Sequence, residues 1–259
     1  MIPLADENPS GKKPYVVYVL IVLNVLVYIV DVLGTRVYPN GMRLSGLWYL
    51  SMVPYSVIHD VRVMPIFNQF GQVAAVRELP GVWPDPQWIT VFTSMFMHGG
   101  LLHIGGNMLY LWIFGNNIED AVGHAKFLLF YLACGVLAAL AHIYSDPNSV
   151  IPTVGASGAI AGVLGAYLYL YPGNRVRTLI ILGFFWDYVE VPALLVLGVW
   201  FLTQLMNLGG SGGLRGGGGV AYWAHVGGFV AGVILILLLG GRKLTRRHPP
   251  RRYYSRFEV

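Results

Sequence analysis

Long apolar runs separated by polar segments dominate the pattern of this chain. Six such runs cover residues 15–33, 93–115, 122–143, 155–171, 192–206 and 221–240. A helix needs about 20 apolar residues to cross the hydrocarbon core of a bilayer. We therefore predict an all-α polytopic membrane protein, a bundle of six transmembrane helices whose two termini lie on the same side of the membrane.

The segments outside these runs differ in character. Residues 1–14 are polar and are predicted to be a short flexible cytoplasmic tail. Residues 34–90 mix Trp and Tyr with proline and a few charges, which favours a structured loop in the membrane interface, although an ordinary extramembrane loop fits as well. Residues 175–191 also suit an interfacial segment better than a crossing. The membrane domain is thus predicted to cover residues 15–240, with a basic cytoplasmic tail at 241–259.

The composition agrees with lipid as the main solvent. The chain has 259 residues, of which 56% are hydrophobic and 11% charged, whereas soluble domains carry about 25% charged residues. The net charge of +5 raises the question of nucleic acid, but seven of the 17 Lys and Arg residues lie between Arg242 and Arg256. A basic segment directly after a span indicates cytoplasmic orientation and contact with anionic lipid. We expect no nucleic-acid partner.

The distribution of Lys and Arg in the short connections predicts the orientation of the chain. The odd-numbered short connections between the predicted spans hold only Arg215. The even-numbered connections and the two tails hold Lys12, Lys13, Lys126, Arg175, Arg177 and the seven C-terminal Lys and Arg residues. Both termini are therefore predicted to be cytoplasmic. The first run is too long for a signal peptide and no cleavage site follows it, which favours a prokaryotic plasma membrane.

Chemistry-bearing residues lie at matching depths on three of the predicted spans. The second, fourth and sixth spans start on the outer side, and near that start they carry His98, His103 and Asn107, then Ser157, then His225. Such groups inside a membrane usually face the interior of a bundle or a wet cavity. We expect them to meet in one site in the outer half of the bilayer.

Small residues indicate how Ser157 and His225 come together. They recur at four-residue spacing, as Ser157, Ala161 and Gly165 on the fourth span and as Gly228 and Gly232 after His225 on the sixth. Small residues at this spacing let two helices approach closely in lipid.

A serine beside a histidine indicates nucleophilic catalysis. A transporter or channel that uses the histidines as a proton relay is the alternative from another functional class. A metal site on His98, His103 and His225 lacks a carboxylate or thiolate ligand.

In three separate segments the chain resembles the rhomboid family of intramembrane serine proteases. These segments are His98-x4-His103-x3-Asn107, Gly155-Ala156-Ser157-Gly158 and Ala224-His225-x2-Gly228-x3-Gly232. The resemblance implies that Ser157 is the nucleophile and His225 its general base. It also implies that His103, Asn107 and the backbone N–H of Ser157 stabilise the oxyanion, while the remaining residues of the three segments support the site.

The resemblance further implies cleavage of single-span membrane proteins near the outer face of the bilayer, without a metal or cofactor. A catalytically inactive rhomboid-like protein that binds membrane clients is the alternative. The glycine-rich segment 207–220 is predicted to be a mobile cap over the site or a flexible linker.

The chain differs from the family in two places. The family often has a Trp-Arg pair before the second span, where this chain has Gln87-Trp88-Ile89-Thr90, so its first loop is expected to be anchored differently. Many members also place an aromatic residue four positions after the serine, beneath the ring of the histidine. Ala161 stands there in this chain, so another group is expected to orient His225.

Overall fold

The computed structural model describes residues 2–8, 10–37, 43–44, 47–68, 73–81, 84–182, 185–208 and 220–247. Most of the glycine-rich segment 207–220 and the basic tail beyond residue 247 lie outside these ranges. The predictions made for both segments therefore stay predictions.

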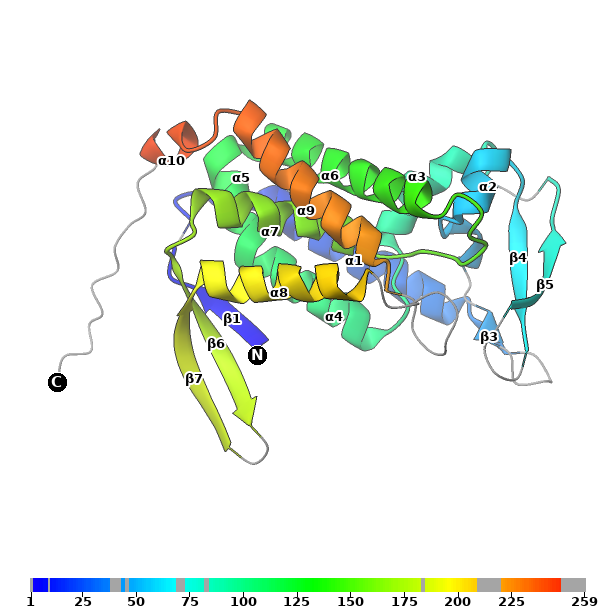
Figure 1. Cartoon of the computed structure of the whole chain (residues 1–259), viewed down its shortest axis with the longest axis horizontal. Coiled ribbons are helices and arrows are strands. Elements are labelled where there is room, and N and C mark those ends of the chain that lie inside the picture. The colour runs from blue at the N-terminus through cyan, green and yellow to red at the C-terminus, as the bar shows by residue number, and fades with distance from the viewer. Residues whose placement is uncertain are drawn as a thin grey trace.

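The described part of the chain is mostly helical (Figure 1). Its longer helices are α1 (Tyr15–Leu33), α6 (His124–Ser145), α7 (Ser157–Leu170), α8 (Ala193–Asn207) and α9 (Tyr222–Leu238). A further continuous helical segment consists of α4 (Leu101–Tyr110), the π-helical η4 (Leu111–Gly115) and α5 (Asn116–Val122). Shorter pieces are η1 (Trp48–Leu50), α2 (Pro54–His59), η2 (Gln87–Ile89), α3 (Thr90–Thr93), η3 (Ser94–Phe96) and α10 (Lys243–Arg247).

The predicted second span is shifted along the chain. We expected it at residues 93–115, but the continuous helix runs from Leu101 to Val122, and α3 and η3 precede it as separate short turns. The pair Gly99-Gly100 interrupts the helical pattern, and Gly100 has an extended backbone. His98 therefore lies in the turn before α4 and not on the helix.

By length and apolarity, α1 and α6 are the two candidates for membrane spans among the described residues. The apolar helices α7, α8 and α9 are shorter, with 14, 15 and 17 residues. The shortest of them, α7, is the most deeply buried, since every residue from Gly158 to Tyr167 is buried. Other helices therefore surround α7 on all sides.

Strands correct the prediction of an all-α fold. An antiparallel sheet in the order β1-β6-β7 consists of β1 (Ile2–Asp6), β6 (Arg175–Leu182) and β7 (Phe185–Pro192). Two further antiparallel pairs lie in the first loop, β2 (Arg36–Val37) with β3 (Arg43–Leu44), and β4 (Val63–Phe67) with β5 (Val73–Glu78). In β6, Val176 and Thr178 are buried and Arg177 between them is exposed, which is the period of two that a strand requires.

The N-terminal segment is ordered, contrary to the flexible tail that we expected. Residues 2–6 pair with β6, and the carboxylate of Asp6 accepts hydrogen bonds from Tyr167 Oη and Asn117 Nδ2, both at 2.7 Å. These contacts fix β1 to the end of α7 that is remote from Ser157. Figure 1 shows β1 and the β6–β7 hairpin at one end of the molecule and β4–β5 at the other.

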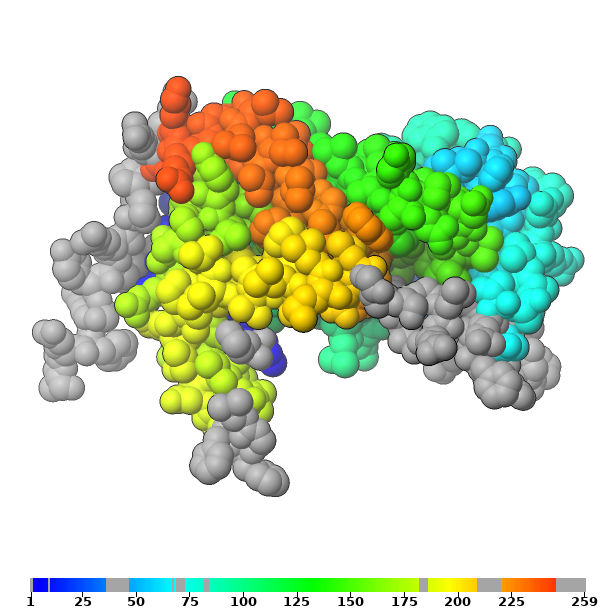
Figure 2. Space-filling model, in the orientation of Figure 1, coloured from blue at the N-terminus to red at the C-terminus, as the bar shows by residue number. Residues whose placement is uncertain are grey.

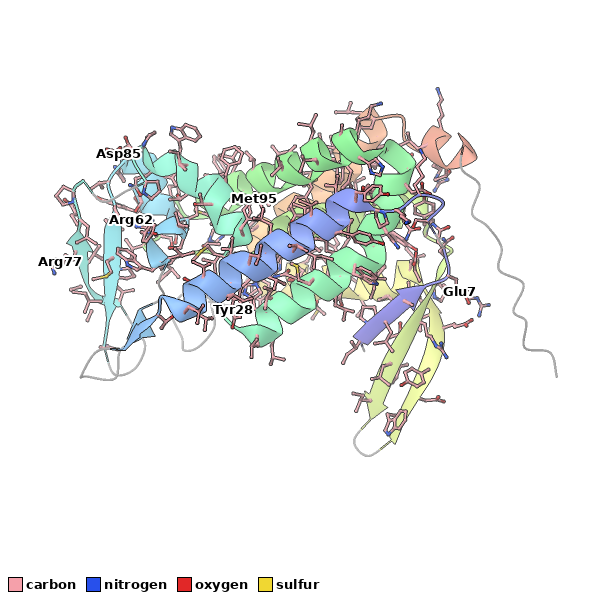
Figure 3. The ribbon with its side chains drawn as sticks, turned by 180° about the vertical axis from the view of Figure 1, so that it is seen from behind. Glu7, Tyr28, Arg62, Arg77, Asp85 and Met95 are labelled. Carbon is pink, nitrogen blue, oxygen red and sulfur yellow. The ribbon has the colours of Figure 1, made fainter. Side chains whose placement is uncertain are left out.

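A buried carboxylate fixes the start of α1. Glu119 on α5 is 1% exposed and accepts hydrogen bonds from the backbone N–H groups of Val16 and Val17, at 3.0 and 2.9 Å. The first N–H groups of a helix have no acceptor within the helix, and a negative charge there is favoured by the helix dipole. Glu119 thereby joins α1 to α5, and α1 then crosses the bundle as Figure 3 shows.

The backbones of α7 and α9 touch. A Cβ atom built on Gly228 would lie 2.1 Å from the carbonyl oxygen of Gly158, and one built on Gly232 would lie 1.9 Å from the carbonyl oxygen of Gly162. The contact face of α7 is therefore Gly158, Gly162 and Gly165, at positions i, i+4 and i+7. We expected this face to consist of Ser157, Ala161 and Gly165, so the prediction was one residue early at its first two positions. Helix α7 is therefore rotated relative to the prediction, and the Ser157 side chain lies at the edge of the contact.

Gly232→Ala should destabilise the protein strongly because its methyl group has no space against α7. Overpacking of this kind costs about 1–3 kcal/mol, and the thermal unfolding temperature in detergent should fall. Gly105→Ala is the matched control, since Gly105 also lies within a helix but nothing lies within 4 Å of its Cβ position. Equal unfolding temperatures for the two variants would contradict the close contact of α7 and α9.

Candidate active site

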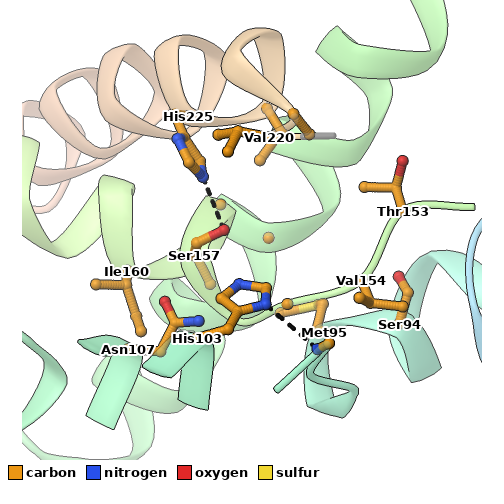
Figure 4. Close-up of a pocket in the computed structure, with 18 of the residues that line it drawn as sticks. Ser94, Met95, His103, Asn107, Thr153, Val154, Ser157, Ile160, Val220 and His225 are labelled. Carbon is orange, nitrogen blue, oxygen red and sulfur yellow. Dashed lines mark hydrogen bonds between the residues drawn. The ribbon is translucent and has the colours of Figure 1, made fainter. Parts of the chain in front are cut away.

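A cavity of about 890 Å³ opens among α4, α6, α7 and α9, at the end of the bundle where Ser157 lies. Ser157, His225, His103 and Asn107 all line it (Figure 4). Four of the residues that the sequence predicted to meet are thus brought together from α4, α7 and α9. The walls between them are made of small residues and a few larger apolar ones.

The chain turns sharply into Ser157. Helix α7 begins at Ser157, and two residues earlier Gly155 has a φ of 128°, a conformation that residues with a side chain rarely adopt. Its N–H donates to the carbonyl of Ser94 at 2.9 Å, and a Cβ atom here would lie 2.9 Å from the imidazole of His103. Gly155 is therefore required both by the turn and by the close approach of His103.

The side chains of Ser157 and His225 are in direct contact. His225 Nε2 lies 2.8 Å from Ser157 Oγ, as the dashed line in Figure 4 shows. On the other side of the ring, His225 Nδ1 lies 2.8 Å from Oε1 of Gln204 on α8. The ring of Trp200 on the same helix lies at a centroid distance of 5.8 Å, inclined by 35°. Helix α8 therefore supplies both a hydrogen-bond partner and an aromatic ring beside His225, whereas position 161 of α7 is an alanine.

Hydrogen-bond donors on α4 and at the start of α7 also line the cavity. The N–H of Gly99 donates to His103 Nδ1 at 3.3 Å, so in the neutral ring the proton is on Nε2. The Nδ2 of Asn107 is buried and has no hydrogen-bond partner among the described residues. The N–H of Ser157 belongs to the first turn of α7, where backbone donors have no acceptor within the helix. Three donors are thus available beside the Ser157 hydroxyl for a negatively charged oxygen.

The other predicted residues lie around this centre. Ala224 and Gly158 line the cavity and face each other, while Gly228 and Gly232 lie deeper, between α7 and α9. His98 is buried outside the cavity lining, and its ring packs edge-on against that of His103 at 5.1 Å. His98 therefore supports His103 and does not face the cavity.

The described residues were also compared with the requirements of a metal site. No group of three or more His, Cys, Asp or Glu side chains that could hold a metal ion occurs there. The three histidines considered as a metal site therefore do not form one. Cys134, the single cysteine, is buried among the helices.

The first loop is anchored by a buried arginine that the sequence analysis missed. Arg62 is 2% exposed and donates to the carbonyls of Trp48 and Ser51, both at 2.8 Å, and to Ser51 Oγ at 3.1 Å. Its guanidinium also lies over the Trp48 ring, 5.1 Å from the centroid. Burial lowers the pKa of Arg62 to about 10, so it remains charged at neutral pH. Figure 3 shows Arg62 at the end of the bundle opposite Glu7.

This anchor connects the first loop to the segment before Ser157. Met52, next to Ser51, exchanges backbone hydrogen bonds with Thr153, at 3.0 and 2.7 Å. Thr153 is four residues before Ser157 in the chain. Arg62 and Trp48 come from separate parts of the loop, which explains how the loop is held without an adjacent Trp-Arg pair.

Comparison with known proteins agrees with this arrangement. The model of the Rhomboid domain family matches residues 85–242. Rhomboid protease GluP of Bacillus subtilis is 32% identical over 146 residues, which cover 56% of this chain and 25% of that protein. Rhomboid-like protein 11, chloroplastic, of Arabidopsis thaliana is 26% identical over 202 residues, 75% of this chain and 65% of that protein. Rhomboid protein 1, mitochondrial, of Saccharomyces cerevisiae is 31% identical over 152 residues, 56% of this chain and 40% of that protein. The chain thus matches less than two thirds of the length of each relative.

Arg62→Leu should destabilise the first loop because it removes the donor to the carbonyl of buried Ser51, at about 1–3 kcal/mol for an unsatisfied group. The carbonyl of Trp48 also loses Arg62 but keeps the hydroxyl and N–H of Ser51 as donors. We expect a lower thermal unfolding temperature and faster proteolytic cutting within residues 34–90. Arg77→Leu is the control, since Arg77 is exposed on β5. An Arg62→Leu protein as stable and as resistant as the Arg77→Leu protein would show that Arg62 does not anchor the loop.

Proposed function

Because the chain belongs to the rhomboid family, a family of membrane proteins that includes proteases, we propose that it is an intramembrane serine protease. It cleaves transmembrane-helix substrates near the outer face of the membrane through an acyl-enzyme. The observation that carries this proposal is the 2.8 Å contact between Ser157 Oγ and His225 Nε2 on the wall of the cavity. A serine hydroxyl becomes an effective nucleophile when such a base can take its proton.

In the first step Ser157 Oγ attacks the carbonyl carbon of the scissile peptide bond, and its proton passes to His225 Nε2. The carbonyl oxygen gains a negative charge in the tetrahedral intermediate. His103 Nε2–H, Asn107 Nδ2–H and the N–H of Ser157 donate to this oxygen, and the N-terminal end of α7 adds a favourable dipole. Donors already in place before the reaction need no reorganisation as the charge develops.

In the second step the C–N bond breaks. The protonated His225 gives its proton to the leaving amine, and the substrate's acyl group remains on Ser157 Oγ as an ester. A water molecule then attacks the ester, His225 takes a proton from that water, and Ser157 Oγ leaves with the proton that His225 returns. The N–H of His103 and of Asn107 stabilises the second oxyanion in the same way.

The lengths of the helices support a site below the membrane surface. We propose six membrane-spanning segments, formed by α1, the continuous α4–η4–α5 segment, α6, α7, α8 and α9. At about 1.5 Å per residue, the 14 residues of α7 extend about 21 Å, less than the ~30 Å hydrocarbon core of a bilayer. With the other end of α7 near the cytoplasmic surface, Ser157 lies within the outer half of the bilayer, where the cavity admits water.

The sheet supports a common side for the N-terminus and the connection after α7. Strand β1 pairs with β6, which directly follows α7, so both lie at the end of the bundle remote from Ser157. Together with the positive charges of Lys12, Lys13, Arg175 and Arg177, this favours a cytoplasmic N-terminus. An even number of spans then gives a cytoplasmic C-terminus. The relatives include mitochondrial and chloroplastic proteins, so the prokaryotic plasma membrane stays a proposal.

Ser157→Ala and His225→Ala should each abolish cleavage of a single-span substrate reconstituted with the protein in liposomes, because each removes one half of the proton transfer. Thermal unfolding should show that both variants remain folded. His59→Ala is the control, as His59 is an exposed histidine at the end of α2, outside the cavity lining. If either dyad variant retained most of the activity, the assignment of Ser157 and His225 would be wrong.

Asn107→Ala should lower kcat by about 10²–10³, the usual effect of removing one donor to an oxyanion, and change KM much less. The expected reason is that Asn107 Nδ2 donates to the oxygen only after charge develops on it. Steady-state cleavage at several substrate densities in the bilayer separates kcat from KM. A variant with wild-type kcat would exclude this role for Asn107.

A further inference from the structure

Gln204 is a buried polar residue on a mostly apolar surface helix, α8. It is 8% exposed, whereas its neighbours Leu202, Leu205 and Met206 are exposed on the outer side of α8. Figure 2 shows α8 and α9 along one face of the molecule. A polar side chain in a lipid-exposed helix is costly unless it has partners inside the bundle. The partner of Gln204 Oε1 is His225 Nδ1, at 2.8 Å.

The remaining hydrogen bonds of Gln204 determine which way its amide faces. Its Nε2 donates to the carbonyl oxygen of Trp200 and to Thr203 Oγ1, both at 3.1 Å. A flipped amide would place its oxygen against the Trp200 carbonyl, which is also an acceptor. The NH₂ group must therefore face Trp200, and Oε1 must face His225.

This orientation selects the tautomer of His225. An amide oxygen only accepts hydrogen bonds, so His225 Nδ1 must carry the proton. The lone pair is then on Nε2, which lies 2.8 Å from Ser157 Oγ and can accept its proton. In the opposite tautomer, Nε2 would carry a hydrogen and could not act as the base.

We propose that Gln204 is a positioning residue that holds His225 in the Nδ1–H tautomer and in the ring orientation required by Ser157. The inference rests on the proposed Ser157–His225 dyad. It gives the site a third member on α8 in place of an aromatic ring at position 161. A neutral amide does this without burying a further charge in a membrane-embedded site, where an isolated carboxylate is costly.

The kinetic test compares Gln204→Leu, which keeps the size of the side chain but removes the acceptor, with Gln204→Glu, which retains an acceptor. The control is Asn207→Leu, because Asn207 also has an amide on α8 but is exposed, and among the described residues it donates only to the backbone carbonyl of Thr203. General-base catalysis contributes about 10²–10⁴-fold. We therefore expect Gln204→Leu to lower kcat by on the order of 10-fold or more, with little change in KM, and Asn207→Leu to match the wild type.

Gln204→Glu should recover most of the activity at alkaline pH. Because a carboxylate stabilises a protonated imidazole, the acid limb of its pH–rate profile should move to higher pH. A merely structural role of Gln204 would not move this limb. Wild-type kcat in Gln204→Leu, or equal losses in the Leu and Glu variants with the same pH profile, would overturn the proposal.

The direct test is the tautomer itself. In protein labelled with ¹⁵N-histidine, the ring signals of His225 are assigned by their loss in His225→Ala. The wild type should show Nδ1 protonated and Nε2 unprotonated, and Gln204→Leu should gain the Nε2–H form. An unchanged tautomer in Gln204→Leu would refute the positioning role. A wild-type protein that does not cleave substrate would refute the Ser157–His225 dyad. A wild-type protein that cleaves substrate, combined with an unchanged rate and tautomer in Gln204→Leu, would refute only the role of Gln204.

Discussion

The contact between the backbones of α7 and α9 is the constraint on which the site depends. Ser157 and His225 are 68 positions apart in sequence, on two different helices, and neither side chain is long. They reach 2.8 Å because Gly158, Gly162, Gly228 and Gly232 leave no side chains between the helices. A methyl group at either of the last two positions would collide with a carbonyl oxygen of α7. In lipid, where apolar side chains gain little from leaving their solvent, such packing is a main source of helix association.

The second requirement is that the polar side chains beside Ser157 are held in place by partners of their own. His225 has Ser157 on one nitrogen and Gln204 on the other, and Gln204 in turn is held by its own helix. His103 accepts from Gly99 and keeps its second nitrogen for the cavity. Asn107 Nδ2 and both ring nitrogens of His98 are buried without a hydrogen-bond partner among the described residues. An unsatisfied donor is costly in a membrane protein. Asn107 lines the cavity, and a transient oxyanion is the acceptor that we propose for its Nδ2.

Much of this arrangement could be predicted from the sequence, because it depends on periodicity and depth. The apolar runs predicted the main helices, and the matching depth of the polar residues on three spans predicted that His103, Asn107, Ser157 and His225 meet. The contact face of α7 was predicted one residue early at two positions, because Ala161 and Gly162 are both small and periodicity alone does not distinguish them. The second helix begins at Leu101 because Gly99-Gly100 interrupts it, a signal that the apolar pattern from residue 93 concealed.

The features that the sequence did not predict depend on contacts between distant residues. The pairing of β1 with β6 joins segments about 170 positions apart, and nothing in residues 2–6 indicates a partner. Arg62 resembled an ordinary loop charge until its acceptors at Trp48 and Ser51 were known. Gln204 was detectable as a polar residue in the apolar run 192–206, but its function depends on a side chain of another helix.

Labelling by a fluorophosphonate probe in detergent tests the central claim most directly, with the modified residue located by peptide mass spectrometry. The account predicts an adduct on Ser157 in the wild type, none in Ser157→Ala, and much slower labelling in His225→Ala. A folded wild-type protein with no adduct on Ser157 would contradict the account and favour a catalytically inactive protein that binds membrane clients.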